Sequence, residues 1–204
     1  MKRSRRRINQ KLYELAELQG GFFTTKQARA NGFADNTHPY HVKTGNWIRV
    51  HRGIYRLAQF PPPERPDLIL WYLWSRNRSE VPQGVYSHET ALALHELSDS
   101  MPAKLHMTVP RGFHRFGKTP AVLRLHRANL TNKDVEEMNG VKVTRPLRTI
   151  ADIVASGKLS VELQQQSLRE AMDRGLVTRK QLENMKLSRR VRQRMRKLLN
   201  TVPA

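Results

Sequence analysis

The histidines of this sequence are the first side chains whose spacing could support chemistry. His88 is followed directly by Glu89 and, seven positions after His88, by His95. A zinc site of the metalloprotease type needs two histidines four positions apart, so that both rings lie on one side of a helix. Here the intervening stretch is apolar and no third ligand is evident. The pattern therefore predicts a residue pair near a helix cap and an ordinary helical histidine, not a metal site.

Three further histidines, His106, His114 and His126, follow in the next part of the chain. They could meet if strands expected over 105–109 and 122–126 paired with each other. No carboxylate lies near them in the sequence to complete a ligand set. We therefore expect hydrogen-bonded or exposed histidines, and no metal ion.

The acidic residues Asp134, Glu136 and Glu137 come closest to a nuclease-like group. They follow Asn132, which predicts the first turn of a short helix, where negative charge is favourable. No acidic pair with a following lysine lies between expected strands, and no P-loop, dinucleotide or nucleophile-elbow motif is present. The chain has no cysteine and so no thiol nucleophile. We expect no enzyme activity, no catalytic residue and no cofactor.

Positive charge is the strongest chemical signal in the sequence. Lys and Arg number 37 against 17 Asp and Glu, a formal net charge of +20. Residues 1–60 carry a net +9 and residues 181–204 a net +6, whereas the longer middle segment, 61–180, carries +5. This segregation predicts two separate contact regions for a polyanion, most simply nucleic acid.

Four prolines within residues 61–66 predict a stiff, extended connector. They divide the chain into a first unit over 1–60, a linker over 61–66 and a second unit over 67–204. No stretch approaches the ~20 apolar residues that span a bilayer. No apolar run follows the basic start MKRSRRR, as a secretory signal would require. We therefore expect a cytoplasmic protein that makes no membrane contact.

The first unit has the element order of a winged helix-turn-helix. The expected elements are a helix from about Ile8 to Gln19, helices over 26–30 and 37–44, and a hairpin over 47–57. Pro39 fits the third helix only in its first turn, where a missing N–H costs nothing. Arg52 and Gly53 supply the hairpin turn. The third helix would lie in the DNA major groove, and the basic hairpin would flank it on the backbone.

Polar and basic side chains of these helices and of the hairpin are the candidate DNA contacts. They are Lys26, Arg29, His38, Tyr40, His41, Lys43, Arg49, Arg52 and Arg56. Tyr40 and His41 could equally be core residues, whereas we expect His38 to be exposed. With ~6 phosphate contacts, the slope of log K against log[salt] is expected near −5.

The sequence of the second unit predicts a mixed α/β domain with a small sheet and several helices. The whole chain is therefore expected to be α+β. The expected helices cover 66–74, a stretch from Ser87 or His88, 146–155, 161–174, 178–186 and 188–199, and the expected strands cover 105–109, 122–126 and 141–143. The alternation of apolar and polar residues over 105–109 is that of a half-buried strand.

The last helix is amphipathic and strongly basic. Its apolar stripe contains Val191, Met195 and Leu198, which predicts that one face docks on the rest of the second unit. The other faces carry Arg189, Arg190, Arg192, Arg194, Arg196 and Lys197. These cations could contact the phosphates of a nucleic acid or take part in the contacts of an antitoxin, and the sequence leaves both open.

Four segments, taken in order, resemble one protein family. They are LYELAELQGGFFTTKQARANGFADNTHPYHVKTGNWIRVHRGIYRL, YSHETALALHEL, KLHMTVPRG and VTRPLRTIADIV. This series resembles the AbiEi family of abortive-infection antitoxins over about Lys11 to Lys186. The sharpest local signature is Gly45 followed by residues 52–57, RGIYRL.

The resemblance implies an antitoxin of a type IV toxin–antitoxin system. In that family the N-terminal winged helix binds inverted repeats in its own promoter and represses the operon. The C-terminal domain counteracts a nucleotidyltransferase-like toxin, generally without a stable complex. We accordingly expect a monomer in solution or a pair assembled on DNA. The alternatives are a stand-alone winged-helix regulator with a ligand-sensing or dimerisation domain, and an enzyme reduced from nuclease-fused relatives.

Overall fold

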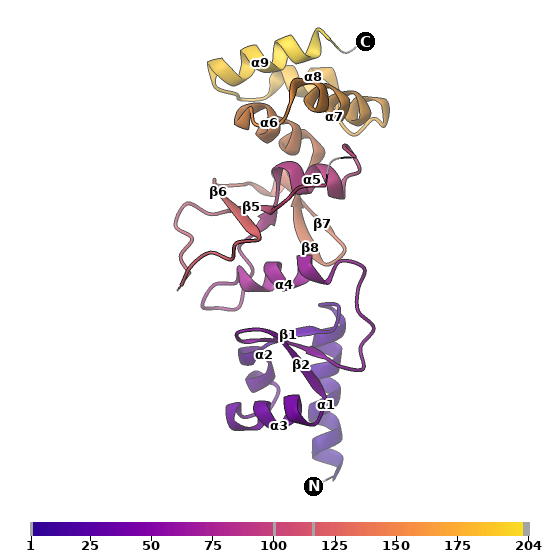
Figure 1. The fold of residues 1–204 in the computed structure, drawn as a ribbon, viewed down its shortest axis with the longest axis vertical. Coiled ribbons are helices and arrows are strands. Elements are labelled where there is room, and N and C mark those ends of the chain that lie inside the picture. The colour runs from indigo at the N-terminus through magenta and orange to yellow at the C-terminus, as the bar shows by residue number, and fades with distance from the viewer. Residues whose placement is uncertain (1, 100, 116, 202–204) are drawn as a thin grey trace. The chain divides into compact units, whose positions relative to one another are not determined.

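A computed structural model of the protein describes residues 2–99, 101–115 and 117–201, with side chains from Asn9 onward. The chain divides into two compact units, which we describe separately. The first is Met1–Gln83 with Asn139–Val141, and the second is Gly84–Met138 with Lys142–Ala204. Helices and strands occur in both units, as expected of an α+β protein (Figure 1).

The first unit is a winged helix-turn-helix with one added helix. Its elements are α1 (Lys2–Glu17), β1 (Phe22–Thr24), α2 (Thr25–Ala30), the 3-10 helix η1 (Asp35–Thr37), α3 (His38–Lys43), β2 (Trp47–His51), β3 (Ile54–Leu57) and α4 (Pro66–Trp74). The strands form an antiparallel sheet in the order β1-β3-β2. The three expected helices and the hairpin are all present, and Pro39 lies in the first turn of α3.

Aromatic side chains fill the core beneath this sheet. The ring centre of Trp47 lies 4.8 Å from that of Phe23 and 5.1 Å from that of Phe33. All three residues are buried. A reciprocal capping box between Thr24 and Gln27 fixes the start of α2 directly after β1. The end of the sheet therefore determines where the helix-turn-helix begins.

The first unit extends beyond the proline-rich segment at which the sequence places its end. Helix α4 packs on β1 and β3, and Leu68, Ile69 and Leu73 are buried. The backbone at Gly20 lies so close to this helix that a Cβ at that position would be only 2.6 Å from Ile69 Cδ1. Apolar burial thus places 61–66 inside the first unit, and the division falls after Gln83.

The second unit combines a small mixed sheet with a helical layer. Its elements are β4 (Val85–Tyr86), α5 (His88–Leu94), β5 (Leu105–Val109), β6 (Leu123–Arg127), η2 (Asn132–Asp134), β7 (Val135–Met138), β8 (Val141–Thr144), α6 (Pro146–Ser156), α7 (Val161–Asp173), α8 (Arg179–Asn184) and α9 (Arg189–Leu199). The strand order is β6-β5-β4-β8-β7. Strand β5 is antiparallel to β4 and parallel to β6.

The helices of the second unit share one apolar core. Ile150, Leu168 and Leu182 are at most 1% exposed, and each comes from a different helix of the set α6 to α8. Helix α9 adds Met195 and Leu198 to the same core. The prediction that one face of the last helix docks on the second unit is confirmed.

The sequence reading missed the shortest strands, β1 and β4, which have three and two residues. It was also wrong about the acidic stretch. Only Asn132–Asp134 is helical, as a 3-10 turn, and Glu136 and Glu137 lie in strand β7. Val135 and Met138 flank that pair, and β7 pairs at the edge of the sheet, where charged side chains are tolerated.

Candidate nucleic-acid interface

Helix α3 is held by the two histidines on its inner side. His38 is 3% exposed, and its Nε2 lies 3.1 Å from the carbonyl oxygen of Phe33. The ring of His41 stacks on Trp47 with centres 4.5 Å apart and planes 18° apart. The expectation that His38 is exposed was therefore wrong, because its ring completes the aromatic core next to Trp47 and Tyr55.

The outer side of α3 presents Tyr40 and Lys43. These residues are three positions apart, so they share one face of the helix. Tyr40 is 63% exposed, and Lys43 is exposed with no ion pair among the residues that the structure describes. Of the two possibilities left open for Tyr40, the exposed one holds. Of the four side chains of α3 that the sequence offered as DNA contacts, Tyr40 and Lys43 are therefore the two on its exposed face.

The hairpin carries two exposed arginines. Arg49 lies in β2, an edge strand of the sheet, and Arg52 forms the tip together with Gly53. Neither guanidinium has an acidic partner within the described parts of the chain. Gly53 has a φ of +73°, a left-handed conformation that glycine adopts without strain. The sheet therefore holds the backbone of the tip in place while both cations extend into solvent.

The side chain of Arg56 is engaged in a hydrogen bond within the first unit. It lies in β3, the central strand, and its Nη1 donates a hydrogen bond of 2.9 Å to the carbonyl oxygen of Phe60. The side chain is half-buried. Arg56 is consequently the weakest of the hairpin candidates for a phosphate contact.

The two cations of α2 are engaged within the first unit. The guanidinium of Arg29 forms a bidentate pair with Asp35, which raises the pKa of Arg29 and lowers that of Asp35 through their hydrogen bond. Lys26 Nζ donates to the carbonyl oxygen of Arg78 at 2.8 Å and lies 3.8 Å from Glu80 Oε1. Both side chains remain about half exposed. Each therefore keeps access to solvent, although part of its charge is already paired.

A buried arginine behind the hairpin tip was not found from the sequence. Arg76 is 8% exposed, and its Nε lies 2.9 Å from Glu80 Oε2. Its Nη2 donates to the carbonyl oxygen of Gly53, which also accepts from the backbone N–H of Thr25. Glu80 in turn accepts a hydrogen bond from the hydroxyl of Thr24. The segment after α4 thus links the start of α2 to the hairpin tip.

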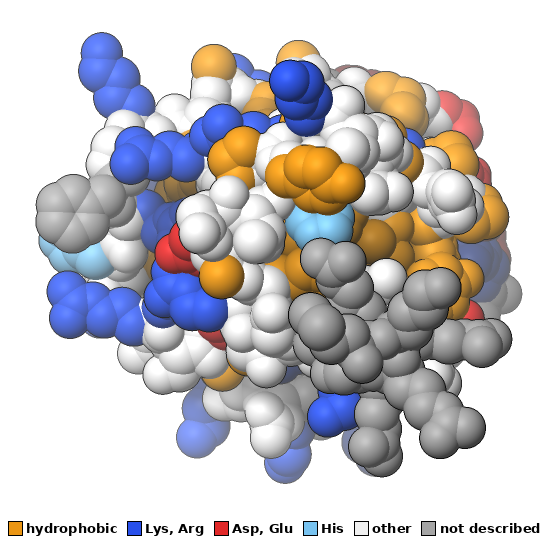
Figure 2. Space-filling view, turned by 90° about the horizontal axis from the view of Figure 1, so that it is seen from below, with side chains coloured by type: hydrophobic (Ala, Val, Ile, Leu, Met, Phe, Trp, Pro, Cys, Tyr) orange, Lys and Arg blue, Asp and Glu red, His pale blue; other side chains and the backbone are white. Residues whose placement is uncertain are grey.

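Figure 2 is a space-filling view from below the view of Figure 1, on the side of the first unit where α3 is drawn. Lys and Arg side chains are spread over this face and few Asp or Glu side chains are visible. Apolar side chains lie beside a histidine near its centre. Within the described surface, this is the composition of a face suited to a polyanion with aromatic or apolar contacts.

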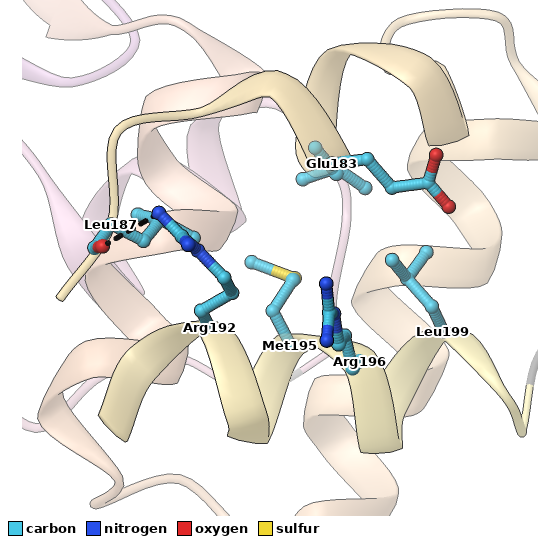
Figure 3. Close-up of a pocket in the computed structure, with 7 residues that line it drawn as sticks. Glu183, Leu187, Arg192, Met195, Arg196 and Leu199 are labelled. Carbon is cyan, nitrogen blue, oxygen red and sulfur yellow. Dashed lines mark hydrogen bonds between the residues drawn. The ribbon is translucent and has the colours of Figure 1, made fainter. Parts of the chain in front are cut away.

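Helix α9 carries the second set of candidate cations. Arg192 and Arg194 donate to the carbonyl oxygens of Leu187 and Val154, each at 3.4 Å. Figure 3 shows Arg192 turned back to Leu187, beside a cavity of about 190 Å³ into which Met195 projects. The remaining four are exposed and have no ion pair in the part of the second unit that is described: Arg189, Arg190, Arg196 and Lys197.

The second unit also contains a polar groove of about 790 Å³. Glu136 is one of its lining residues, with its carboxylate 3.7 Å from His95 Nε2 and 3.8 Å from Arg145 Nη1. Arg174 lines the same groove and donates to the carbonyl oxygen of His95.

None of the described helices is long and apolar enough to cross a membrane.

Two parts of the chain match known protein families. Residues 10–58 match a family described as transcriptional regulator, AbiEi antitoxin. Residues 84–201 match the AbiEi antitoxin C-terminal domain. No curated protein matches the chain.

A solved structure is similar in fold. The crystal structure of the RV2827C protein from Mycobacterium tuberculosis aligns with a TM-score of 0.60, covers 95% of this chain and 76% of that chain, and is 12% identical in sequence. Identity this low shows a common fold alone. The second family match by itself spans more than half of the 204 residues, and the two matches fall in the two compact units. The chain belongs to the AbiEi antitoxin family, whose N-terminal part is that of a transcriptional regulator.

Proposed function

We propose that the protein is an antitoxin that represses its own operon. Its first unit binds inverted repeats in the promoter, and its second unit counteracts a nucleotidyltransferase-like toxin in the cytoplasm without a stable complex. The observation that carries the DNA-binding half is the set of exposed cations on α3 and the hairpin that have no ion pair with any described residue, namely Lys43, Arg49 and Arg52. The family membership supports the antitoxin half.

The contacts divide by element. Tyr40 and Lys43 on the outer side of α3 reach the edges of bases or the phosphates along the major groove. Arg49 and Arg52 meet the backbone or the minor groove beside it. Lys26 and Arg29 add weaker phosphate contacts, because part of their charge is already paired. We exclude His38 from the interface since its ring is buried.

An inverted repeat presents two half-sites related by a two-fold axis, so two copies of the chain bind it. We propose that the copies are monomers in solution and pair on DNA. The four exposed cations of α9 supply either further phosphate contacts or the surface that acts on the toxin. Loss of repression and loss of toxin rescue distinguish these two roles.

The experiment combines two readouts in one strain. The promoter of the operon drives a reporter, and the product of the adjacent gene is co-expressed to measure growth rescue. The double variant Arg49→Ala/Arg52→Ala should lose repression and keep rescue. Arg169→Ala removes one exposed helical arginine of the second unit and serves as the control that should change neither readout. Repression that survives in the double variant would contradict the proposed interface.

The variant Arg189→Ala/Arg190→Ala tests α9 in the same strain. Loss of repression alone assigns these two cations to DNA, and loss of rescue alone assigns them to the toxin. A variant that behaves as wild type in both readouts would remove the basic face of α9 from the function.

The polar groove of the second unit favours a second candidate, a regulator that senses a small ligand. Its lining brings Glu136, Arg145 and His95 together in about 790 Å³, which is within the range of small-molecule sites. In that case Arg145→Ala should change how repression responds to growth conditions. Neither this variant nor the wild-type chain should rescue growth when the product of the adjacent gene is co-expressed. Full rescue from a toxin by this variant would favour the antitoxin instead.

A further inference from the structure

An aromatic pocket of about 230 Å³ lies within the first unit. Rings from five residues line it: Tyr13 of α1, Phe33, His41 of α3, Trp47 of β2, and Phe60. The pocket therefore borders both the helix and the hairpin that carry the candidate DNA contacts. None of the exposed cations of these two elements belongs to its described lining.

The rings of this lining present faces and edges at several angles. Trp47 is stacked with His41 at 4.5 Å between centres, and Phe33 meets Trp47 edge-on at 5.1 Å. Tyr13 and Phe60 form a tilted pair at 5.9 Å. Aromatic rings attract one another in offset-stacked and edge-to-face arrangements. A planar aromatic ligand would therefore find favourable contacts with this lining.

Backbone hydrogen bonds hold the lining in place. Trp47 pairs with Leu57 across β2 and β3, and both residues line the pocket. The backbone N–H of Asn46 donates to the carbonyl oxygen of His41 at 3.0 Å, and the Asn46 carbonyl oxygen accepts from the N–H of Ala58. The end of α3 is thus tied to the start of β2 and to the segment after β3. A pocket formed in this way exists before its ligand arrives, as small-molecule sites usually do.

The pocket is uncharged, although the chain is rich in charge. No Lys, Arg, Asp or Glu is part of its described lining, whereas 26% of the residues of the chain are charged. The groove of the second unit and the cavity beside α9 both contain arginines. An ion in the aromatic pocket would lose its hydration without gaining an opposite charge. The lining therefore selects an uncharged ligand.

Three exposed amide side chains, those of Asn9, Asn46 and Gln59, complete the lining. Asn46 Nδ2 donates to the hydroxyl of Thr44 at 2.9 Å. Their other amide donors and acceptors have no hydrogen-bond partner among the described residues. A carboxamide offers a donor and an acceptor side by side, which matches the edge of a heterocycle such as a purine. The amides thus suit a ring that carries nitrogen or oxygen atoms at its edge.

We propose that this pocket binds a small, uncharged, planar heterocycle of two fused rings, such as a free purine base. An apolar cavity of about 150 Å³ holds a benzene molecule, so a pocket of about 230 Å³ has room for a larger ring system. The ligand stacks on the aromatic rings and bonds to the amides with its edge. The site is separate from the proposed DNA contacts and from the toxin, so it stands or falls independently of the proposed function.

The test is a titration of the isotope-labelled full chain with adenine, followed by nuclear magnetic resonance of the tryptophan side-chain N–H groups. The chain has three tryptophans, of which Trp47 lines the pocket and Trp71 and Trp74 do not. The Trp47 signal should shift and saturate, while those of Trp71 and Trp74 should not move. Equal shifts of all three signals, or a Trp47 shift that never saturates, would overturn the proposal. This measurement on the wild-type chain does not depend on whether a variant folds.

Two alanine variants at exposed apolar positions test the lining. Tyr13→Ala removes a ring that is 46% exposed and should weaken adenine binding by about 10-fold or more, as expected for the loss of a stacking partner. Leu18→Ala removes a side chain that is 82% exposed and lies outside the pocket, so it should bind as wild type. Equal affinities of the two variants would overturn the proposal.

Adenosine monophosphate tests the selection against charge, because it keeps the purine and adds a phosphate. High salt screens the general attraction of a basic chain for anions. Under that condition the nucleotide should shift the Trp47 signal with an affinity about 10-fold lower than that of adenine. A nucleotide that binds as tightly as adenine would contradict the assignment of an uncharged ligand.

Discussion

At the residue scale, burial shows which polar side chains of α3 support the core and which are free to contact DNA. His38 and Tyr40 are two positions apart on α3, and both could contact DNA by residue type alone. The ring of His38 is enclosed by Trp47 and Tyr55, whereas Tyr40 is 63% exposed. Sequence reasoning could not assign them because the aromatic core that encloses His38 forms only when β2 and β3 fold.

This difference predicts opposite phenotypes for two alanine variants. His38→Ala should lower the free energy of unfolding by about 1–3 kcal/mol, because a buried hydrogen bond and its ring contacts are lost. Tyr40→Ala should leave that free energy within about 0.5 kcal/mol of wild type and weaken operator binding. Urea unfolding and a binding titration measure the two effects. Equal stability of the two variants would show that His38 is not a core residue.

His88, His106 and His126 of the second unit, whose rings contact one another, predict a pH dependence of stability. The pKa of His88 is lowered to about 3 and those of His106 and His126 to about 4, chiefly by burial, from an unfolded value of 6.5. The unfolded chain therefore binds more protons below pH 6.5. The stabilisation is complete above that pH and is lost as the pH falls toward 4.

Each proton taken up on unfolding contributes a slope of about 1.4 kcal/mol per pH unit. Urea unfolding at pH 7, 6 and 5 should show this decline, and His126→Gln should make it shallower. A free energy of unfolding that does not change between pH 7 and pH 5 would contradict the lowered pKa values.

At the scale of elements, hydrophobic periodicity and cap residues predicted most helices of the chain. Helix α4 has the predicted bounds, 66–74, and α6 and α9 differ from prediction by one residue at one end. What the pattern could not show is the unit that each element joins. Prolines indicate a stiff connector, but the buried face of α4 on β1 and β3 determines that the first unit continues beyond it.

The packing of α4 predicts that the isolated first unit needs residues up to Gln83. A fragment over 1–83 should unfold cooperatively, whereas one over 1–60 should lose a large part of its stability. Loss of Leu68, Ile69 and Leu73 removes about 1.5–3 kcal/mol for each of these buried side chains, and the link from Arg76 to Gly53 is lost as well. Thermal unfolding followed by circular dichroism compares the fragments. Equal midpoints would show that α4 does not support the winged helix.

The candidate sites show the same limit of sequence reasoning. Arg49 and Arg52 could be predicted because a hairpin tip exposes its side chains whatever the core contains. The mutual packing of His88, His106 and His126 could not be predicted, because it requires the parallel pairing of β5 with β6 and the position of His88 at the start of α5. The sequence suggested that His106, His114 and His126 could meet. His106 and His126 do, whereas His114 is exposed, and no sequence pattern pointed to His88 as their neighbour.

At the scale of the whole molecule, the net charge of +20 is concentrated toward the two ends of the chain, with +9 in residues 1–60 and +6 in residues 181–204. Exposed cations without an ion pair in the described chain lie on α3 and the hairpin in the first unit, and on α9 in the second. Phosphate contacts release counterions, so each contact contributes about 0.9 to the slope of log K against log[salt]. Replacing these cations one at a time by alanine and measuring the salt slope of each variant therefore counts the phosphate contacts that each surface makes.

The salt dependence of operator binding is the most direct measurement of the central proposal, that α3 and the hairpin sit against a double helix. Wild-type protein should give a slope near −5, as expected for ~6 phosphate contacts. The Arg49→Ala/Arg52→Ala variant should give a slope smaller in magnitude by about 1.8, while Arg169→Ala keeps the wild-type value. A double variant with the wild-type slope and affinity would contradict the proposal.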